Sequence, residues 1–353
     1  MPNIAVVGTT SWGTTLAVVL ARKALSVRLW ARTEEEAVEL TSNGSNHPIL
    51  SQTEFPRQLS VTSSLDEALD GASAVILAVP SQRMRKNIRL VARHLNDSTL
   101  IVSAAKGMEL GSGKRMSQVI ADEVKASFRP NICVLSGPNL SEEILGELPA
   151  ATVVASEDKV KARKLQKLLV TPKFCVYTNT DVIGVELGGT LKNIIAMGAG
   201  IADGLGYGDN AKAALVTRGL TEMTALGMAL GANPLTFSGL AGLGDLIATC
   251  ASTLSRNHFV GVELAKGRPL KEITESMTGV AEGVSTTLVV WTMAKKMGLA
   301  MPITETIYRV LYEDADIHEA AAELMTIEAN HELAGRKWRL FSFLRQNTPS
   351  LPK

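Results

Sequence analysis

The sequence is poor in cysteine and in net charge. Its three cysteines, Cys133, Cys175 and Cys250, lie far apart within apolar runs. They show no C-x-x-C or Cys/His spacing, which argues against a disulfide framework and a zinc site, so we expect core thiols, a reducing compartment and no bound metal. The formal net charge is only +1. No global field therefore favours nucleic acid or an anionic membrane, and any anion site must be local.

The sequence also lacks a signal-peptide pattern and long hydrophobic runs. Met1-Pro2-Asn3 leads straight into an apolar strand, without a charged segment followed by a long apolar one. We expect none of the later apolar runs to be long enough to span a bilayer. These absences predict a cytoplasmic protein without an integral membrane segment. With 353 residues, the chain is long enough for two domains and a sizeable core.

Short apolar runs alternate with helical runs in the first half of the chain, as in βαβ units. The strands are expected at residues 4–7, 27–30, 74–79, 99–103, 132–135, 152–155 and 174–177, with a charged helix at about 157–169 between the last two. Strands that alternate with helices predict a mainly parallel, doubly wound sheet. After about residue 180 the strand signals stop, and helical periodicity rich in alanine, leucine and methionine continues to about residue 330.

We therefore predict an α/β protein with an N-terminal doubly wound Rossmann-type domain followed by an all-α C-terminal domain. The domains are expected at residues 1–180 and 181–335. A basic aromatic tail at 336–353 is predicted to be amphipathic or disordered, with an interfacial membrane helix as the alternative.

The first helix of the second domain contains several glycines around a lysine. Lys192 is expected to rise from a strip that holds Gly188 and Gly189, on a different face from the apolar residues of this helix. Glycine inside a helix costs about 0.5–1 kcal/mol relative to alanine, so these glycines indicate close approach of a backbone or a ligand. The alternative is tight helix packing with a lysine that reaches out to solvent. We expect Lys192 to lie at the seam between the two domains.

A glycine turn follows the first strand and precedes a helix. It matches the dinucleotide pattern G-x-G-x-x-G at Gly8 and Gly13, but Thr10 replaces the middle glycine. Thr10 is expected either to tilt the pyrophosphate away slightly or to offer its own hydroxyl. A plain βα turn is the alternative, although the position between strand and helix favours dinucleotide binding.

The end of the second strand carries Arg32 where an NAD-selective site usually has an acid. A guanidinium there pairs with a 2′-phosphate or stacks on adenine, which favours NADP(H) or tolerance of both cofactors. Glu34 and Glu35 follow and would restore an NAD-like arrangement. A solvated arginine at a strand end is the alternative.

Two lysines and an acid are expected to meet in one crevice. Lys106 follows a strand at its carboxyl end, where ligands sit in doubly wound folds, and Lys192 faces it from the helix. Each ammonium raises the cost of protonating the other, which lowers a lysine pKa from about 10.4 toward neutral pH. Asp245, directly after a glycine turn, is interpreted either as a helix N-cap or as a carboxylate that orients a lysine.

The tripeptide Ser255-Arg256-Asn257 combines a hydroxyl, a guanidinium and an amide. This combination suits a phosphate monoester, because a guanidinium makes bidentate charge-assisted hydrogen bonds to phosphate oxygens. An ordinary loop is the alternative interpretation.

With these features in order, the chain resembles the bacterial NAD(P)-dependent glycerol-3-phosphate dehydrogenase family over nearly its whole length, to about residue 330. The motifs that carry the resemblance are Ser11-Trp12-Gly13, Ala105-Lys106-Gly107, Ser136-Gly137-Pro138, Leu187-Gly-Gly-Thr-Leu-Lys192-Asn193, Gly242-Leu-Gly244-Asp245-Leu246, Ser255-Arg256-Asn257, Val280-Ala-Glu282-Gly283 and Met301-Pro-Ile-Thr-Glu305. The resemblance implies hydride transfer between NAD(H) or NADP(H) and dihydroxyacetone phosphate or sn-glycerol 3-phosphate. It also implies a homodimer and a role in phospholipid synthesis.

The resemblance implies the following site residues. The cofactor contacts are Gly8, Thr10, Ser11, Trp12, Gly13, Arg32, Lys106, Ser141, Arg256, Val280 and Glu282. The substrate contacts are Lys106, Gly137, Asn139, Lys192, Asn193, Asp245, Thr249, Ser255, Arg256 and Asn257. The catalytic group is Lys192 for proton transfer, with Lys106 and Asp245 to position and tune it.

Three residues depart from the family pattern, namely Thr10, Asn139 and Ser141. They touch the edges of the cofactor and substrate sites, so they affect the expected cofactor affinity and preference but leave the expected activity in place. The tail extends past the family's usual end.

Three alternative functions stay open at this point. A dehydrogenase for a hydroxy acid or an opine is disfavoured, because such substrates carry a carboxylate, whereas Ser255-Arg256-Asn257 suits a phosphate. A protein that binds a dinucleotide and signals its redox state without catalysis is also disfavoured. Such a sensor would not need the combination of Lys106, Lys192, Asp245 and Arg256. A membrane-docked scaffold would use the basic aromatic tail.

Overall fold

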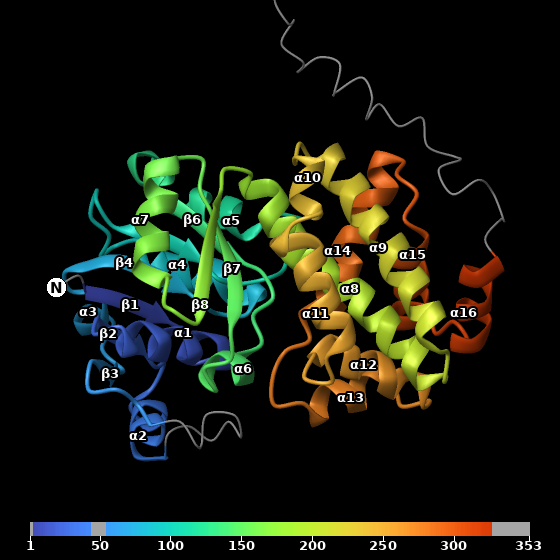
Figure 1. Ribbon diagram of the computed structural model, residues 1–353, viewed down its shortest axis with the longest axis horizontal. Helices are drawn as coiled ribbons and strands as arrows, with labels where there is room; N and C mark the ends of the chain where they lie inside the picture. Colours follow the sequence, from blue (N-terminus) through green and yellow to red (C-terminus); the bar gives the residue numbers. More distant parts are fainter. Residues whose placement is uncertain (1–2, 44–53, 327–353) are drawn as a thin grey trace, which may run out of the picture.

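The chain forms a sheet domain and a helical domain that lie side by side (Figure 1). The structure is a computed structural model that describes residues 3–43 and 54–326. The predicted tail at 336–353 lies outside these described residues. The predicted fold class, a doubly wound Rossmann-type domain followed by an all-α domain, is confirmed.

One sheet of eight strands forms the core of the first domain in the described part of the chain. The strands are β1 (Asn3–Val7), β2 (Ser26–Trp30), β3 (Leu59–Thr62), β4 (Ala72–Leu77), β5 (Leu100–Ser103), β6 (Ile132–Ser136), β7 (Ala150–Ala155) and β8 (Phe174–Asn179). Their order in the sheet is β3-β2-β1-β4-β5-β6-β7-β8. All neighbouring strands are parallel except β6 and β7, which are antiparallel. The sequence predicted every strand except β3, a short edge strand.

Helices cover both faces of this sheet. They are α1 (Ser11–Arg22), α2 (Glu34–Asn43), α3 (Leu65–Leu69), α4 (Met84–Val91), α5 (Met116–Glu123), α6 (Ser141–Leu145) and α7 (Lys159–Leu169), with short 3₁₀ helices η1 (Ser81–Arg83) and η2 (Ala126–Asn131). Alternate residues of β1 belong to two different cores, Ile4 and Val6 to one, Ala5 and Val7 to the other. Because side chains of a strand alternate between faces, burial on both sides explains the continuous apolar runs in the sequence.

The helical domain is built around one long buried helix, α8 (Val182–Gly204). The other helices are α9 (Asp209–Ala229), α10 (Pro234–Phe237), the π-helix η3 (Leu240–Gly244), α11 (Asp245–Ala251), α12 (Arg256–Ala265), α13 (Leu270–Ser276), α14 (Glu282–Met297), α15 (Pro302–Tyr312) and α16 (Ile317–Thr326). Helices α9, α11, α12 and α14 pack against α8. The first helix after the sheet is therefore also the core of the second domain.

The glycines of α8 mark places where another backbone comes very close. A Cβ added to Gly188 would lie 2.2 Å from the carbonyl oxygen of Ala241 in η3, and one added to Gly200 would lie 2.1 Å from that of His258 in α12. No side chain fits at such distances. The predicted close approach is confirmed, and at these two glycines it is made by backbone.

Two acids, the buried Glu186 and the half-buried Glu282, join the two domains. Glu186 of α8 accepts hydrogen bonds from the Ser117 amide at 2.7 Å and the Ser117 hydroxyl at 2.6 Å, and it also pairs with Arg115. Glu282 at the start of α14 accepts a hydrogen bond of 2.8 Å from the Ser81 amide and another from the Ser81 hydroxyl. A buried acid is stable only when its oxygens are paired, so these contacts fix one domain against the other.

Two expectations from the sequence were wrong. Cys175 is exposed, because β8 is an edge strand that buries Phe174 and Val176 and turns the intervening side chains outward. Two segments are long and apolar enough to cross a membrane, Val182–Gly204 and Pro234–Ala251. The first is the buried core helix α8, and the second is broken into α10, η3 and α11, so neither has the form of a single exposed span.

Candidate active site

A buried aspartate holds two lysines, one from each domain. Asp245 is only 1% exposed. Its Oδ2 accepts a hydrogen bond of 2.6 Å from Lys106 Nζ, and its Oδ1 accepts one from Lys192 Nζ. Lys106 Nζ also donates to the carbonyl oxygen of Gly137 at 2.8 Å. We call Lys106, Lys192 and Asp245 the lysine cluster.

Each member of the lysine cluster comes from a different element. Lys106 follows the carboxyl end of β5, Lys192 lies on α8, and Asp245 is the first residue of α11. The interpretation of Asp245 as the N-cap of α11 was wrong, because Gly244 is the cap and it makes no side-chain hydrogen bond. One turn further along α11, the Thr249 hydroxyl accepts a hydrogen bond of 2.5 Å from Lys192 and donates to the Asp245 carbonyl at 2.6 Å.

The electrostatics of the cluster favour a lysine that titrates near neutral pH. Burial is the main cause that lowers the pKa of Lys106, Asp245 opposes it, and the charge of Lys192 acts with burial. Together they bring the pKa from 10.5 to about 7. Desolvation disfavours a charged amine, and a second ammonium repels it. Two ammonium groups against one carboxylate also leave a local excess of positive charge, which attracts an anionic substrate.

At the start of α12, the side chains of Ser255 and Asn257 form hydrogen bonds within the protein, whereas that of Arg256 forms none in the described residues. Ser255 is the N-cap of α12 and accepts a hydrogen bond of 3.2 Å from the His258 amide. Asn257 donates to Asn193 Oδ1 at 3.0 Å and accepts from the Gly283 amide at 2.9 Å, which ties α12 to α8 beside Lys192.

Arg256 differs from its two neighbours. It is exposed and has no hydrogen-bond or ion-pair partner within the described residues. Its guanidinium lies against Gly279, where an added Cβ would be 2.5 Å from Nη1. A free guanidinium at a helix N-terminus is well suited to a phosphate group.

The glycine turn after β1 fits a dinucleotide. Gly8 has a φ of +114°, and a Cβ there would lie 2.6 Å from the Ala78 carbonyl oxygen, while a Cβ at Gly13 would lie 2.1 Å from the Gly8 carbonyl oxygen. Only glycine allows this tight turn to lead into α1. Thr10 caps α1 by accepting from the Gly13 amide, and it donates its proton to Ala78 O at 2.8 Å. Its hydroxyl is therefore not a free donor for a phosphate.

Further donors at this turn have no protein acceptor. Within the described residues, the amides of Ser11 and Trp12 at the N-terminus of α1 make no hydrogen bond, and the buried indole nitrogen of Trp12 has none either. Helix N-terminal amides bind phosphate groups. The turn therefore has the features that a cofactor pyrophosphate requires.

At the end of β2 the acid that faces Arg32 is Glu36, which was not predicted from the sequence. Glu36 Oε2 accepts a hydrogen bond of 2.9 Å from the Arg32 amide and lies 3.5 Å from its Nε. Glu34 instead accepts from Ser63, and Glu35 is exposed. The signal in the sequence is the i,i+4 spacing of Arg32 and Glu36, which brings side chains together at the start of a helix.

Two buried polar atoms in the β6–α6 segment have no partner within the described residues. They are Ser136 Oγ and Asn139 Oδ1. A Cβ added to Gly189 would lie 2.2 Å from Ser136 Oγ and 3.5 Å from Lys106 Cδ, so this hydroxyl lies next to Lys106. Asn139 donates to Thr152 Oγ1 at 3.1 Å. Buried polar atoms normally have partners, so these two indicate a bound ligand or water.

The remaining predicted residues do not join the lysine cluster. Ser141 is the first residue of α6, and Val280 is 49% exposed just before α14. In the described ranges no hydrogen bond links either to the cluster. Glu282 contacts Ser81, and burial raises the pKa of Glu282 although both Ser81 hydrogen bonds lower it.

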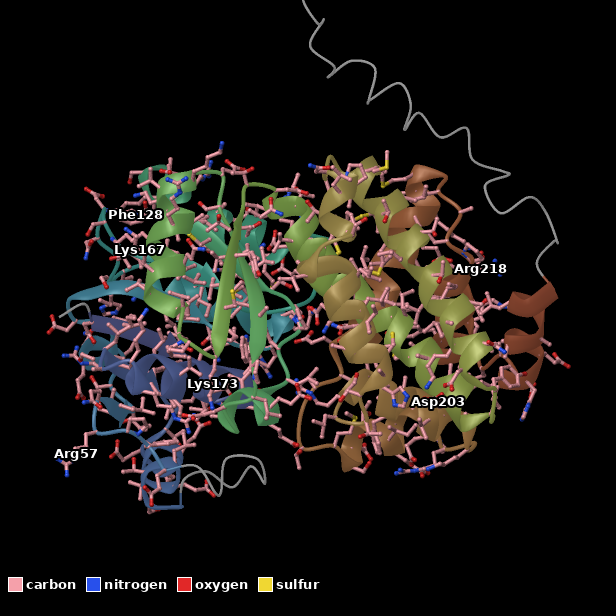
Figure 2. All side chains as sticks on the ribbon, in the orientation of Figure 1. Arg57, Phe128, Lys167, Lys173, Asp203 and Arg218 are labelled. Atoms are coloured by element: carbon pink, nitrogen blue, oxygen red, sulfur yellow. The ribbon has the colours of Figure 1, made fainter. Side chains whose placement is uncertain are left out.

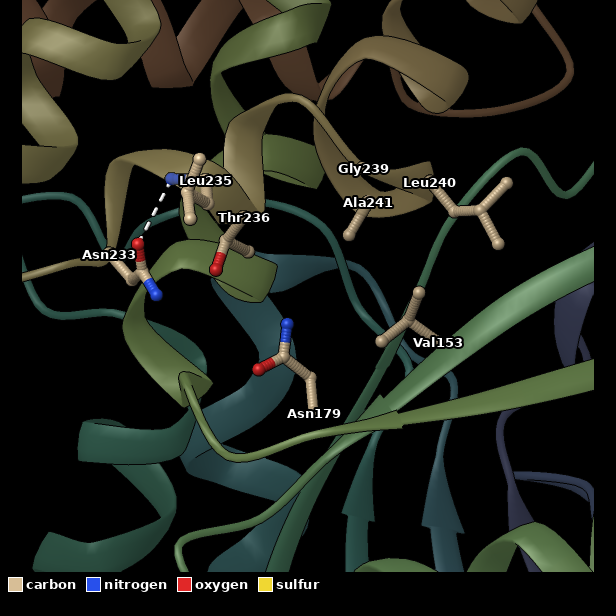
Figure 3. Close-up of a pocket in the computed structure, with 8 residues that line it drawn as sticks. All are labelled: Val153, Asn179, Asn233, Leu235, Thr236, Gly239, Leu240 and Ala241. Carbon is tan, nitrogen blue, oxygen red and sulfur yellow. Dashed lines mark hydrogen bonds between the residues drawn. The ribbon is translucent and has the colours of Figure 1, made fainter.

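A separate cavity of about 210 Å³ lies between strands β7 and β8 on one side and α10 and the π-helix η3 on the other (Figure 3). Its lining residues are Val153, Asn179, Asn233, Leu235, Thr236, Gly239, Leu240 and Ala241. None of them is a predicted site residue, and none is ionisable. The Thr236 hydroxyl already donates to Asp181 at 2.7 Å. This cavity is therefore distinct from the lysine cluster.

One further cluster of ionisable groups lies away from Lys106, Lys192 and Asp245. Asp203, labelled in Figure 2, pairs with His258 and Lys212 at the far end of α8, in the helical domain. Within residues 3–43 and 54–326, no group of three or more His, Cys, Asp or Glu side chains is placed to hold a metal ion.

Comparison with known proteins gives a consistent result. Residues 3–162 match the family profile "NAD-dependent glycerol-3-phosphate dehydrogenase N-terminus", and residues 181–322 match the corresponding C-terminus profile. A Dehalococcoides mccartyi protein, strain 195, described as glycerol-3-phosphate dehydrogenase [NAD(P)+], is 61% identical over 100% of this chain and 99% of its own length. A Geobacter metallireducens protein with the same description is 48% identical over 94% of this chain and 98% of its own length.

The fold agrees with a solved structure. The crystal structure of glycerol-3-phosphate dehydrogenase from Coxiella burnetii superposes with a TM-score of 0.86 at 38% identity. The match covers 92% of this chain and 98% of that one.

Proposed function

The chain belongs to the NAD-dependent glycerol-3-phosphate dehydrogenase family, and we propose that it interconverts dihydroxyacetone phosphate and sn-glycerol 3-phosphate. The observation that carries this proposal is the lysine cluster, in which a buried carboxylate orients two ammonium groups at the domain seam. The bound nicotinamide would supply or accept the hydride at the substrate carbon.

Lys192 is the proposed proton donor to the carbonyl oxygen, and it acts as base in the reverse direction. Asp245 and Thr249 hold its ammonium in a single position. A group that donates a proton in the transition state must already be aligned with the oxygen, and such alignment contributes to the rate. Lys106 adds a second positive charge near the oxygen as negative charge develops there.

Arg256 is the proposed phosphate ligand, with Ser255 and Asn257 holding the start of α12 in place. Its guanidinium is free to make bidentate hydrogen bonds to phosphate oxygens. The energy of binding this remote group would then orient the carbonyl next to Lys192. A hydroxy acid or opine offers no phosphate group for this arginine, so the family's phosphorylated substrate is favoured over those alternatives.

For the cofactor, NAD(H) or NADP(H), the glycine turn and the N-terminus of α1 would hold the pyrophosphate. Gly8 and Gly13 shape the turn, and the amides of Ser11 and Trp12 are available to the phosphates. We also assign Arg32, Ser141, Val280 and Glu282 to the cofactor, and Gly137, Asn139 and Asn193 to the substrate, as proposals from the resemblance.

We further propose a homodimer in the cytoplasm that supplies glycerol 3-phosphate for phospholipid synthesis. The proposed domain boundaries stay at 1–180 and 181–335, with the tail at 336–353. The end of β8 at Asn179 and the start of α8 at Val182 support the first boundary.

The experiment is steady-state oxidation of NADH and of NADPH, measured separately, with dihydroxyacetone phosphate and with unphosphorylated dihydroxyacetone. Turnover that depends on the phosphate is the expected result. Binding of cofactor without turnover of either ketone would contradict the proposal and favour the sensor alternative.

A further inference from the structure

Glu36 connects the two loops that follow the carboxyl ends of β1 and β2, and the first of these loops is the glycine turn. Its Oε1 accepts a hydrogen bond of 2.5 Å from the Thr9 hydroxyl, in the turn after β1. Its Oε2 accepts from the Arg32 amide at 2.9 Å, just after β2. The carboxylate comes from the first turn of α2 and folds back over both strand ends.

The first glycine turn and the end of the second strand bind a dinucleotide in doubly wound folds. The first glycine turn receives the pyrophosphate, and the adenosine ribose lies next to it, over the end of the second strand. An acid there accepts a hydrogen bond from the ribose 2′-hydroxyl of NAD, whereas a free arginine accommodates the 2′-phosphate of NADP. In this chain β2 ends at Trp30 and is followed by Ala31, so the strand end itself supplies no acid.

Glu36 is charged and positioned for that role. Partial burial raises its pKa, but the hydrogen bond from Thr9 and the contacts with Arg32 outweigh this effect and hold the pKa below its usual 4.5. The side chain of Glu36 is 24% exposed, so it is accessible to a ligand although both loops hold it. The side chain of Arg32, in contrast, is 78% exposed, and its guanidinium contacts Glu36 through a 3.5 Å ion pair.

We propose that Glu36 sets the cofactor preference of this enzyme toward NAD(H). Its carboxylate accepts a hydrogen bond from the ribose 2′-hydroxyl, repels a 2′-phosphate in the same place, and competes with that phosphate for Arg32. The proposal rests on the proposed function for the identity of the cofactor, and it assigns to Glu36 the role that the sequence had suggested for Glu34 or Glu35.

Glu36→Gln is the test, because the amide keeps the shape of the side chain and removes the charge. Dissociation constants for NADH and NADPH are measured by the change in protein fluorescence, and kcat/KM for each cofactor with dihydroxyacetone phosphate. Adenosine 2′,5′-bisphosphate is a third probe, since it carries the 2′-phosphate without a nicotinamide. Glu35→Gln is the matched control, because Glu35 lies in the same helical turn and is exposed.

In the wild type, NADH should bind more tightly than NADPH. In Glu36→Gln the ratio of the two dissociation constants should shift toward NADPH by about tenfold or more, the scale of one hydrogen bond to a charged group. Adenosine 2′,5′-bisphosphate should bind more tightly as well. Thr9→Val, which removes a donor to Glu36 but keeps its charge, should shift the ratio in the same direction by less.

The result that overturns the inference is a ratio in Glu36→Gln within about twofold of the wild type, well under the energy of such a hydrogen bond. An equal shift in Glu35→Gln would also overturn it, because a general change in surface charge would then be the cause. A shifted binding ratio in a protein without turnover would support the role of Glu36 and contradict the proposed function, so the two failures are distinguishable.

Discussion

The lysine cluster and the start of α12 are both assigned to the same proposed reaction. The charged groups of the lysine cluster pair with one another, whereas Arg256 at the start of α12 forms no ion pair within the described residues. Lys106, Lys192 and Asp245 all have charged partners at hydrogen-bond distance. Arg256, on α12, makes no hydrogen bond or ion pair in the part of the chain that the structure describes and is attracted only by the more distant charge of Glu282. Its neighbour Asn257, in contrast, both donates and accepts a hydrogen bond. The difference matches the two proposed roles, in which the lysine cluster orients a proton and Arg256 binds the phosphate of the substrate.

The physical reason for this difference is the cost of misalignment. A proton donor must be within hydrogen-bond reach of one oxygen in the transition state, so a rigid network is an advantage. A phosphate ligand gains most when the guanidinium gives up few existing contacts on binding, so an unpaired arginine is an advantage. The following predictions test this division, in order of decreasing effect.

Lys192→Ala should lower kcat most. Loss of a general acid costs about 10²–10⁴-fold in rate. KM for dihydroxyacetone phosphate should change little, because the proposed phosphate ligand, Arg256, is still present. Steady-state kinetics and circular dichroism measure both the rate and the fold. Lys212→Ala is the control, since Lys212 pairs with Asp203 away from the crevice, and a fall in kcat of similar size in that variant would contradict the assignment.

Arg256→Ala should mainly raise KM for the phosphorylated ketone. A hydrogen bond to a charged group contributes about 1.5–3 kcal/mol, which corresponds to about 10–100-fold in affinity. Arg268→Ala is a matched control, because Arg268 follows the same helix and is already paired with Glu263. If Arg256→Ala instead lowered kcat and left KM unchanged, the division between the two regions would be wrong.

The pH dependence should report Lys106. Burial, opposed by Asp245 and aided by the charge of Lys192, brings the pKa of Lys106 from 10.5 to about 7, so its positive charge is present below that pH and is lost as the pH rises through it. We expect kcat/KM to fall on the alkaline side, because the crevice then attracts the anionic substrate less strongly. Lys106→Arg keeps the charge at all these pH values, so it should move the alkaline limb to higher pH. An unmoved limb would show that another group titrates there.

Gly188→Ala should reduce stability and disturb the lysine cluster through η3. The added Cβ would lie 2.2 Å from Ala241 O, so α8 and η3 must separate. Overpacking of this kind costs about 1–3 kcal/mol. Chemical denaturation measures it. Gly244→Ala is the control, because Gly244 has helical dihedral angles and its added Cβ would make only ordinary contacts, the nearest 3.4 Å from Leu240. Equal losses in both variants would argue against the close approach as the cause.

Much of the fold follows from local patterns. The apolar run of β1, the glycines at positions 8 and 13 and the helix after them each depend on neighbours in sequence, so the strand–turn–helix unit was predictable. The edge strand β3 was missed because it buries only Leu59 and Thr62. Likewise, Cys175 lies in an apolar run but its side chain is exposed. The exposure results from the position of β8 at the edge of the sheet, which the local sequence does not reveal.

The candidate site likewise has features that the sequence determines and features that depend on tertiary structure. The sequence by itself determined the kind of residues available: lysines at 106 and 192, an aspartate at 245 and an arginine at 256. Only the tertiary structure decided that Asp245 binds both lysines rather than capping α11, and that Glu36 rather than Glu34 or Glu35 faces Arg32. Periodicity is a property of adjacent residues, whereas these contacts join separate elements, and packing of those elements against each other sets their distances.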